Sequence, residues 1–240
     1  MGRFNGKVAL VTGAGSGIGQ ATAAVLVQGG ATVTGFDING AALEATAREI
    51  QAAGGMMAVA VGNAGSHSTC HETVANVFEK HGRLDFLANI AGIASSQHLD
   101  DLREEEWDRL VAVNLSGVIW FSQAAMPHLV QAEGSMVNVA SSAAMIGQAY
   151  TAAYSATKGG VVALTRSLAM EYARTGVLVN AISPGAVETP LTRDYRIPEG
   201  ADMELVQRYI GFRGIAQPSQ VAERHRAMRL ARGGDRTPER

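Results

Sequence analysis

Short apolar runs alternate along the chain with longer segments in which apolar residues recur at helical spacing. The short runs cover residues 8–11, 31–36, 57–61, 84–88, 135–139 and 178–182, and they predict strands buried on both faces. The longer segments cover 18–28, 41–53, 67–80, 104–130 and 150–173, and they predict helices. Repeated strand–helix units of this kind predict an α/β fold with one doubly wound parallel sheet and helices on both faces.

Composition is consistent with a single domain in a reducing compartment. The 240 residues are 47% hydrophobic, enough to bury a substantial core. A net charge of −2 argues against nucleic acid or an anionic membrane as the main partner. Cys70 is alone, so no intrachain disulfide is expected, and a cytoplasmic location is predicted. The N-terminus lacks a signal-peptide pattern, and no apolar run approaches the roughly 18 residues of a membrane span.

Tyr154 and Lys158 stand four residues apart, and Ser141 lies upstream of them. Positions i and i+4 share one face of a helix, so the ammonium group can approach the phenol. One positive charge about 4 Å away, at an effective dielectric of about 20, favours a phenolate by about 4 kcal/mol, or roughly three pKa units. The spacing therefore indicates a proton-transferring pair; the alternative is an amphipathic helix with a surface tyrosine and a solvated lysine.

A glycine-rich loop follows the first predicted strand and leads directly into a helix. It spans residues 12–19 and reads T-G-A-G-S-G-I-G. Gly13, Gly17 and Gly19 allow a tight turn and the close approach of a pyrophosphate, whose charge is stabilised at the start of a helix. The context favours a Rossmann-type dinucleotide site over a glycine-rich turn without a ligand.

Asp37 closes the second predicted strand. A carboxylate there can accept hydrogen bonds from the adenosine ribose and would repel a 2′-phosphate. No lysine or arginine stands in the glycine loop or within several residues after Asp37. NAD is therefore the predicted cofactor, in preference to NADP. The alternative is that Asp37 caps the following helix, because Asn39 and Gly40 come next.

These residues and their order resemble the short-chain dehydrogenase/reductase family, in its subfamily of about 250 residues. The resemblance extends from the N-terminus to about Ala222 and implies an NAD(P)-binding oxidoreductase domain over residues 1–222. It implies a catalytic set of Asn114, Ser141, Tyr154 and Lys158. Tyr154 and Lys158 are also implied to contact the cofactor, together with Gly13, Gly15, Ser16, Gly17, Ile18, Gly19, Asp37, Asn63, Ala64, Asn89, Ala91, Gly92, Pro184, Gly185, Val187 and Thr189.

Two positions depart from the family pattern. Asn63 replaces an aspartate that contacts adenine, but its amide oxygen can still accept a hydrogen bond. Ile90 replaces the second asparagine of the family's N-N-A-G motif, which here reads Asn89-Ile90-Ala91-Gly92. Two neighbours compete for catalytic roles, Tyr150 with Tyr154 and Ser142 with Ser141. The spacing to Lys158 favours Tyr154, and Ser141 has the family's separation from that tyrosine.

The resemblance implies reversible hydride transfer between a nicotinamide and a carbonyl carbon, with no metal site. Tyr154 would act as the general acid and base, and Ser141 would orient the substrate oxygen. Lys158 would hold the nicotinamide ribose and lower the pKa of Tyr154, while Asn114 would anchor a water molecule that connects Lys158 to solvent.

The substrate pocket is expected to be mostly apolar, with a few polar points, and to suit a medium-sized secondary alcohol or ketone. Its walls are expected at 93–97, 145–148, 186–188 and a mobile lid at 191–212. One alternative is an NADPH-dependent 3-oxoacyl-acyl-carrier-protein reductase, against which Asp37 weighs. The substrate is expected to be a small molecule. The resemblance also implies a homotetramer or homodimer, built partly through the helices that carry Asn114 and Tyr154.

The sequence after residue 222 departs from the family. Residues 223–240 contain six arginines and no strand-like run, so the last strand of the family is expected to be missing or altered. A frameshifted gene, a basic tail for an acidic partner and a solvated disordered end are the three explanations. Loss of that strand raises a second alternative, a catalytically impaired nucleotide-binding protein.

Overall fold

Six parallel strands form one sheet at the centre of the protein. The computed structural model describes residues 2–209 and 214–228. Within this part of the chain the strand order is β3-β2-β1-β4-β5-β6. This is the predicted doubly wound sheet, whose order reverses between β1 and β4. The strands are β1 Val8–Thr12, β2 Thr32–Asp37, β3 Met57–Val61, β4 Phe86–Asn89, β5 Ser135–Val139 and β6 Leu178–Ile182.

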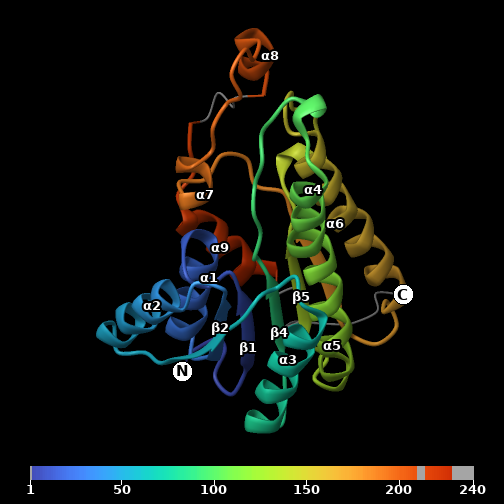
Figure 1. Ribbon diagram of the computed structural model, residues 1–240. Helices are drawn as coiled ribbons and strands as arrows, with labels where there is room; N and C mark the ends of the chain where they lie inside the picture. The colour runs from blue at the N-terminus through green and yellow to red at the C-terminus, as the bar shows by residue number, and fades with distance from the viewer. Residues whose placement is uncertain (1, 210–213, 229–240) are drawn as a thin grey trace, which may run out of the picture.

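Helices cover both faces of this sheet. In Figure 1, α1, α2 and α9 lie on one side, and α3, α5 and α6 on the other. The α-helices are α1 Gly17–Gln28, α2 Gly40–Ala52, α3 His67–His81, α4 Glu104–Val111, α5 Gly117–Gln131, α6 Ala152–Glu171, α7 Pro190–Arg193, α8 Met203–Gln207 and α9 Pro218–Met228. Short helical turns are η1 Leu99–Asp101, η2 Ala112–Ser116 and η3 Ser142–Ala144.

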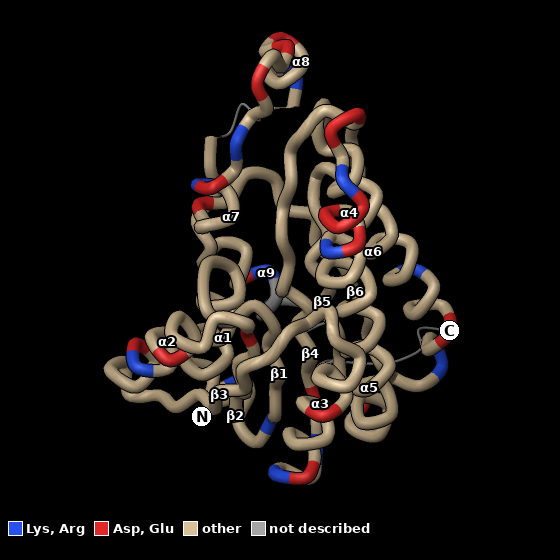
Figure 2. The backbone as a smooth tube through the Cα atoms, viewed as in Figure 1, with Lys and Arg blue, Asp and Glu red and all other residues tan. Residues whose placement is uncertain are grey.

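Successive residues of the central strands face opposite layers of helices. Leu10 of β1 packs in a cluster with Phe121 of α5, whereas its neighbour Val11 packs with Leu26 and Leu43 of α1 and α2. Burial of large apolar side chains on both faces explains why the strands read as continuous apolar runs. Figure 2 shows that lysine, arginine, aspartate and glutamate lie mainly on the outer helices and loops.

The predicted single helix over 104–130 is interrupted, which corrects the sequence interpretation. The structure has α4, then the π-helical turn η2, then α5. A π-turn adds a residue to one helical turn and often marks a functional position. Apolar periodicity continues across η2, so the pattern did not show the interruption.

Taken together through η2, the helical segment Glu104–Gln131 is long and apolar enough to cross a bilayer by length and composition. The sequence interpretation had found no such run. Of the segment's 18-residue apolar window, 44% is buried inside the protein. Its side chains pack with those of α3 in the core cluster. The buried core helix of a globular domain also meets this length and composition criterion.

The end of the described chain is helical. The helix α9 crosses the expected boundary at residue 222 and packs against α1, with Val221 and Ala222 buried. An isolated parallel β-bridge pairs Val187, which precedes α7, with Ala216, which precedes α9. The described residues contribute six strands to the sheet, with β6 at one edge. The remainder of the predicted tail, 229–240, lies outside the described residues.

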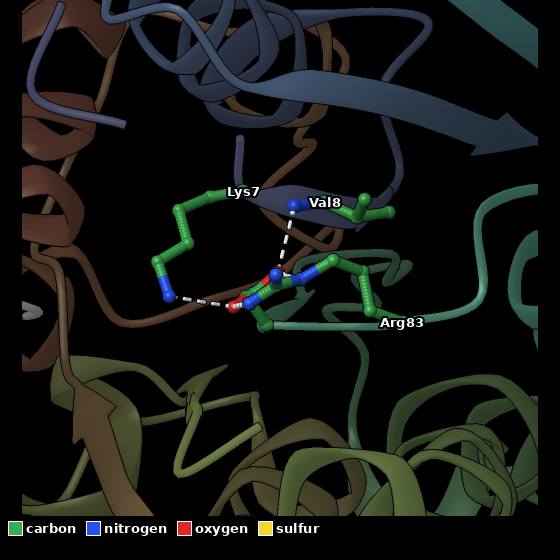
Figure 3. A network of polar contacts seen from close by, with 4 residues as sticks. Lys7, Val8 and Arg83 are labelled. Atoms are coloured by element: carbon green, nitrogen blue, oxygen red, sulfur yellow. Dashed lines mark hydrogen bonds and ion pairs between the residues drawn. The ribbon is translucent and has the colours of Figure 1, made fainter. Parts of the chain in front are cut away.

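A buried carboxylate joins β1 to the loop that precedes β4. Asp85 is fully buried, and its oxygens accept hydrogen bonds from Lys7 Nζ (2.9 Å), Arg83 Nη2 (2.6 Å) and the backbone N–H of Val8 (2.9 Å) (Figure 3). Burial alone would raise the pKa of Asp85, but these donors outweigh it and hold the pKa below its ordinary value. The ionised carboxylate thus stabilises the start of the central strand pair.

We expect Asp85→Asn to lower the free energy of unfolding at pH 7 by about 2 kcal/mol, because charge-assisted hydrogen bonds are lost in a buried position. The pKa of Asp85 is lower in the folded state, so its stabilisation is complete above the unfolded pKa of about 3.9 and is lost as pH falls through the folded pKa. Urea denaturation of wild type and variant across this range measures the difference. The exposed Asp100→Asn serves as the control, and equal effects of both substitutions would contradict the assignment.

Candidate active site

A pocket opens at the carboxyl ends of the strands, where the sheet order reverses. Residues from the loops after β1, β4, β5 and β6 and from the start of α6 line it. The predicted site residues among them are Gly13, Ser16, Gly17, Ile18, Gly19, Gly92, Ser141, Tyr154, Lys158, Pro184, Gly185, Val187 and Thr189. The structure therefore brings the glycine loop and the Tyr154-Lys158 pair to one cavity, as expected for a ligand that spans a doubly wound sheet.

The glycine loop has no room for larger residues. Gly13 and Gly17 have φ values of 69° and 52°, which glycine adopts without strain. A Cβ at Gly13 would lie 2.9 Å from Ala91 N, and one at Gly19 would lie 2.0 Å from Gly13 O. The loop leads into the N-terminus of α1, where within the described chain the Ser16 side chain makes no capping hydrogen bond. Backbone amides at a helix start suit the pyrophosphate of a dinucleotide.

Asp37 lies against this loop at the end of β2. Its Oδ2 accepts from Gly15 N (2.9 Å), and its Oδ1 accepts from Asn39 N (2.9 Å). The cap of α2 is Asn39, whose Oδ1 accepts from Ala42 N (3.1 Å). Asn39, and not Asp37, therefore caps α2. Asp37 keeps its carboxylate at the edge of the glycine loop, and these residues together fit a dinucleotide.

The predicted adenine contacts, Asn63 and Ala64, are not among the described residues that line the pocket. Asn63 Oδ1 already accepts from Gly65 N (2.9 Å), a turn contact that the sequence interpretation did not consider. Ala64 is buried, and its carbonyl oxygen accepts from Cys70 Sγ. A second lone pair on Asn63 Oδ1 can still accept a hydrogen bond from a ligand.

One hydroxyl, that of Thr12, holds the segment Asn89 to Ala91 next to the end of β1. Thr12 Oγ1 accepts from the N–H groups of Ile90 (2.9 Å) and Ala91 (3.1 Å). Asn89 is buried, is not among the residues that line the pocket, and donates through Nδ2 to Asn138 Oδ1 (2.8 Å). Replacement of an asparagine by Ile90 leaves this backbone connection intact. The sequence interpretation missed the role of Thr12, although its place at the end of β1 offered a signal.

Asn114 connects three elements from inside the π-turn η2. It is fully buried, its Oδ1 accepts from Ile93 N (2.8 Å), and its Nδ2 donates to Ile93 O (2.8 Å). The same Nδ2 donates to Thr157 Oγ1 (3.3 Å) on α6, next to Lys158. The side chain thus holds the loop after β4 beside the helix that carries Tyr154.

Tyr154 is the titratable phenol of the pocket. Burial raises its pKa, a hydrogen bond from Ser141 acts in the opposite direction, and the neighbouring Tyr195 raises it further. Ser141 Oγ accepts from Ala143 N (3.2 Å), so its proton is free to be donated. In the protein itself Tyr154 therefore holds its proton at neutral pH.

Lys158 is buried behind Tyr154. Its Nζ donates to the carbonyl oxygen of Val139 (2.8 Å) and lies 6.0 Å from the centre of the Tyr154 ring. Burial lowers the pKa of Lys158 to about 8. The sequence interpretation expected the ammonium group to lower the pKa of Tyr154, but in this structure burial of the phenol dominates. The contact with Val139 was not foreseen, because a backbone acceptor leaves no signal in the sequence.

The two competing side chains have other partners. Tyr150 Oη accepts from Asp202 N (2.7 Å), and Ser142 Oγ accepts from Gln148 Nε2 (3.2 Å). Thr189 caps α7 through Thr192 N while it faces the pocket. Among the residues that the structure describes, no three histidine, cysteine, aspartate or glutamate side chains gather where they could hold a metal ion.

Comparison with known proteins assigns the chain to a family. The family model described as short chain dehydrogenase matches residues 7–200. The chain is 38% identical over 222 residues to the 3-oxoacyl-[acyl-carrier-protein] reductase of Thermotoga maritima, covering 92% of this chain and 89% of that protein. It is 36% identical over 223 residues to the cyclohexanol dehydrogenase of an Acinetobacter species, covering 92% and 86%.

A solved structure has the same fold. The 3-ketoacyl-(acyl-carrier-protein) reductase of Brucella melitensis, complexed with NADH, superposes with a TM-score of 0.84 at 32% identity and covers 95% of this chain and 92% of its own. Sequence, fold and the arrangement of the pocket agree. The chain belongs to the short-chain dehydrogenase family of oxidoreductases.

Proposed function

We propose that the protein is an NAD-dependent oxidoreductase that interconverts a secondary alcohol and a ketone. One observation carries the proposal: Tyr154, Ser141 and Lys158 line the same pocket as the glycine loop. A phenol that can exchange a proton therefore stands beside a site that fits a dinucleotide. A bound nicotinamide dinucleotide supplies the hydride in reduction and accepts it in oxidation.

The chain's own residues bind the substrate oxygen and move its proton. Ser141 Oγ donates a hydrogen bond that orients the oxygen next to Tyr154 Oη. Because burial raises the pKa of Tyr154, the phenol is protonated at neutral pH and can donate to an alkoxide. In oxidation the phenolate must accept the proton, and its formation depends on positive charge in the pocket, to which Lys158 contributes.

Asn114 and Lys158 act together behind the phenol. Asn114 holds Thr157, the residue before Lys158, while Val139 O orients the ammonium group. We propose that a proton leaves the pocket through Lys158 and a water molecule held near Asn114. The lowered pKa of Lys158, about 8, suits a group that gives and takes a proton near neutral pH.

The position of Asp37 supports NAD. Its carboxylate lies on the glycine loop, where it would repel a 2′-phosphate. The Brucella melitensis relative was solved with NADH. The two 3-oxoacyl reductase relatives favour a second candidate, reduction of 3-oxoacyl groups on acyl carrier protein. The neutral to acidic character of the chain weighs against docking of that acidic partner.

We also propose that copies of the chain associate through α5 and α6. An apolar groove between these helices is lined by Ile119, Met126, Val130, Leu164, Leu168 and Tyr172, among others. Apolar grooves of this kind mark association surfaces.

We expect Tyr154→Phe to lower kcat for alcohol oxidation and ketone reduction by at least about 10²-fold, because the proton donor is lost while the ring remains. Steady-state kinetics with NAD and NADH measure the effect. Asp100→Asn, an exposed change in η1, is the control. Retention of more than about a hundredth of wild-type turnover by Tyr154→Phe would remove that residue from the proposed role.

We expect NADH, at about 100 times its Kd, to stabilise the folded protein by about 2.7 kcal/mol, and NADPH at the same concentration to stabilise it much less. Thermal unfolding with each cofactor measures the two shifts. Asp37→Asn keeps a hydrogen-bond acceptor but removes the charge, so the NADPH shift should increase. Glu44→Gln, an exposed change on α2, is the control, and a larger shift with NADPH in the wild type would favour the acyl reductase.

We expect Lys158→Met to abolish turnover and yet to stabilise the folded protein by about 1 kcal/mol at pH 7. The pKa of Lys158 falls from 10.5 to about 8 on folding, which corresponds to a penalty of about 3 kcal/mol, partly offset by the lost bond to Val139. The penalty is full below pH 8 and disappears as pH rises towards 10.5. Denaturation at pH 7 and 10 tests this, and an advantage that does not shrink at pH 10 would contradict it.

A further inference from the structure

The segment 190–209, called the lid segment here, carries part of the pocket wall. It begins with α7, whose Leu191 and Thr192 line the pocket, and it ends just after α8. None of its residues belongs to the core clusters found in the described part of the chain. In Figure 1, α8 projects away from the sheet. The position of the lid segment therefore depends on its contacts with neighbouring loops.

Two aromatic side chains hold the turn that leads into α8. Tyr150 Oη accepts a hydrogen bond from Asp202 N (2.7 Å), and His98 Nε2 donates one to Glu199 O (2.9 Å). The rings of Tyr150 and His98 meet edge to face, with their centroids 5.0 Å apart. Asp202 is also the N-cap of α8, because its Oδ1 accepts from Glu204 N (2.9 Å). The two rings therefore fix the start of α8.

The backbone of Tyr150 has a conformation that residues other than glycine rarely adopt. Its φ is 64°, in the left-handed region. Its carbonyl oxygen accepts a hydrogen bond from Gln97 N (2.8 Å), which attaches it to the loop after β4. The next residue, Thr151, is the N-cap of α6, the helix that carries Tyr154. Such conformations persist where the surroundings enforce them, and they cluster at ligand clamps and switch segments.

We propose that Tyr150 is a positioning residue for the substrate. Its hydroxyl tethers the lid segment to the start of α6 and so holds in place the pocket wall formed by Leu191 and Thr192. This inference rests on the proposed function. The lid segment is fixed at one end by Thr189, whose Oγ1 accepts from Thr192 N (3.3 Å), and at the turn before α8 by Tyr150. Loss of the tether frees the lid segment and weakens substrate binding, while the groups that transfer the proton stay in place.

Limited proteolysis of the full-length protein by trypsin reports on the tether without any substrate. Trypsin cleaves after Arg196 and Arg208 in the lid segment, and after the exposed Arg174 outside it, which serves as the internal reference. Tyr150→Phe keeps the ring but removes the acceptor of Asp202 N. We expect cleavage at the two lid sites, relative to Arg174, to become about fivefold faster, which corresponds to the roughly 1 kcal/mol of one hydrogen bond.

Steady-state kinetics separate a positioning role from a purely structural one, with cyclohexanol and NAD as the probes. We expect Tyr150→Phe to raise KM for cyclohexanol about fivefold and to leave kcat and KM for NAD within about twofold of wild type, because the reacting groups are untouched. His98→Phe removes the second hydrogen bond to the lid segment and should act in the same direction. Glu44→Gln, an exposed change on α2, is the control and should change none of these constants.

Each outcome distinguishes the inference from the proposed function. Equal rates of lid cleavage in Tyr150→Phe and wild type, or a fall in kcat without a rise in KM, overturn the inference and leave the proposed function standing. Marked loss of thermal stability in Tyr150→Phe means that the hydroxyl supports the whole fold, which also overturns the inference. Reduction of a 3-oxoacyl thioester in place of oxidation of cyclohexanol overturns the proposed function, and the proteolysis, which needs no substrate, still decides whether the tether exists.

Discussion

The need to satisfy the buried amide of Asn114 is the constraint on which the site depends. A fully buried amide without partners would be costly, and here both of its polar atoms bind the backbone of Ile93. The π-turn η2 places this side chain where it also reaches Thr157. The loop after β4 and the helix α6 are therefore held at one separation. Tyr154 and Lys158 lie on the same helix, on either side of Thr157 in the sequence, so the geometry of this pair depends on the buried amide of Asn114.

A second pair of contacts fixes the two central strands at both ends. Asp85 binds Val8 at the amino end of β1, and Thr12 binds Ile90 and Ala91 at the carboxyl end. The sheet order reverses between these strands, and the crevice for ligands lies at that point. Any slip between β1 and β4 would move the glycine loop relative to Gly92. The two contacts, one charged and one neutral, therefore set the width of the cofactor end of the pocket.

The apolar periodicity of the sequence was sufficient to predict the sheet. It was not sufficient to predict the local departures from regular structure that form the site. All six strands and the five long helical segments were predicted from the apolar pattern, whereas α7, α8 and α9 were not. The choice of Tyr154 and Lys158 rested on their spacing, and that of Ser141 on the family resemblance. The π-turn at Asn114 was missed because a one-residue insertion into a helical turn keeps the apolar pattern. The contact from Lys158 to Val139 was missed because every residue has a carbonyl oxygen.

Burial has opposite effects on the pKa values of the two groups that the proposed chemistry needs. It raises the pKa of Tyr154 and lowers that of Lys158, so both are biased towards their neutral forms. A protonated phenol is ready to reduce a ketone, whereas alcohol oxidation needs a phenolate. Among the described residues that line the pocket, Lys158 carries the one ammonium group, and it donates to Val139 O. The direction of catalysis therefore depends on the charge added to the pocket on binding, because the residues alone favour the acid form of Tyr154.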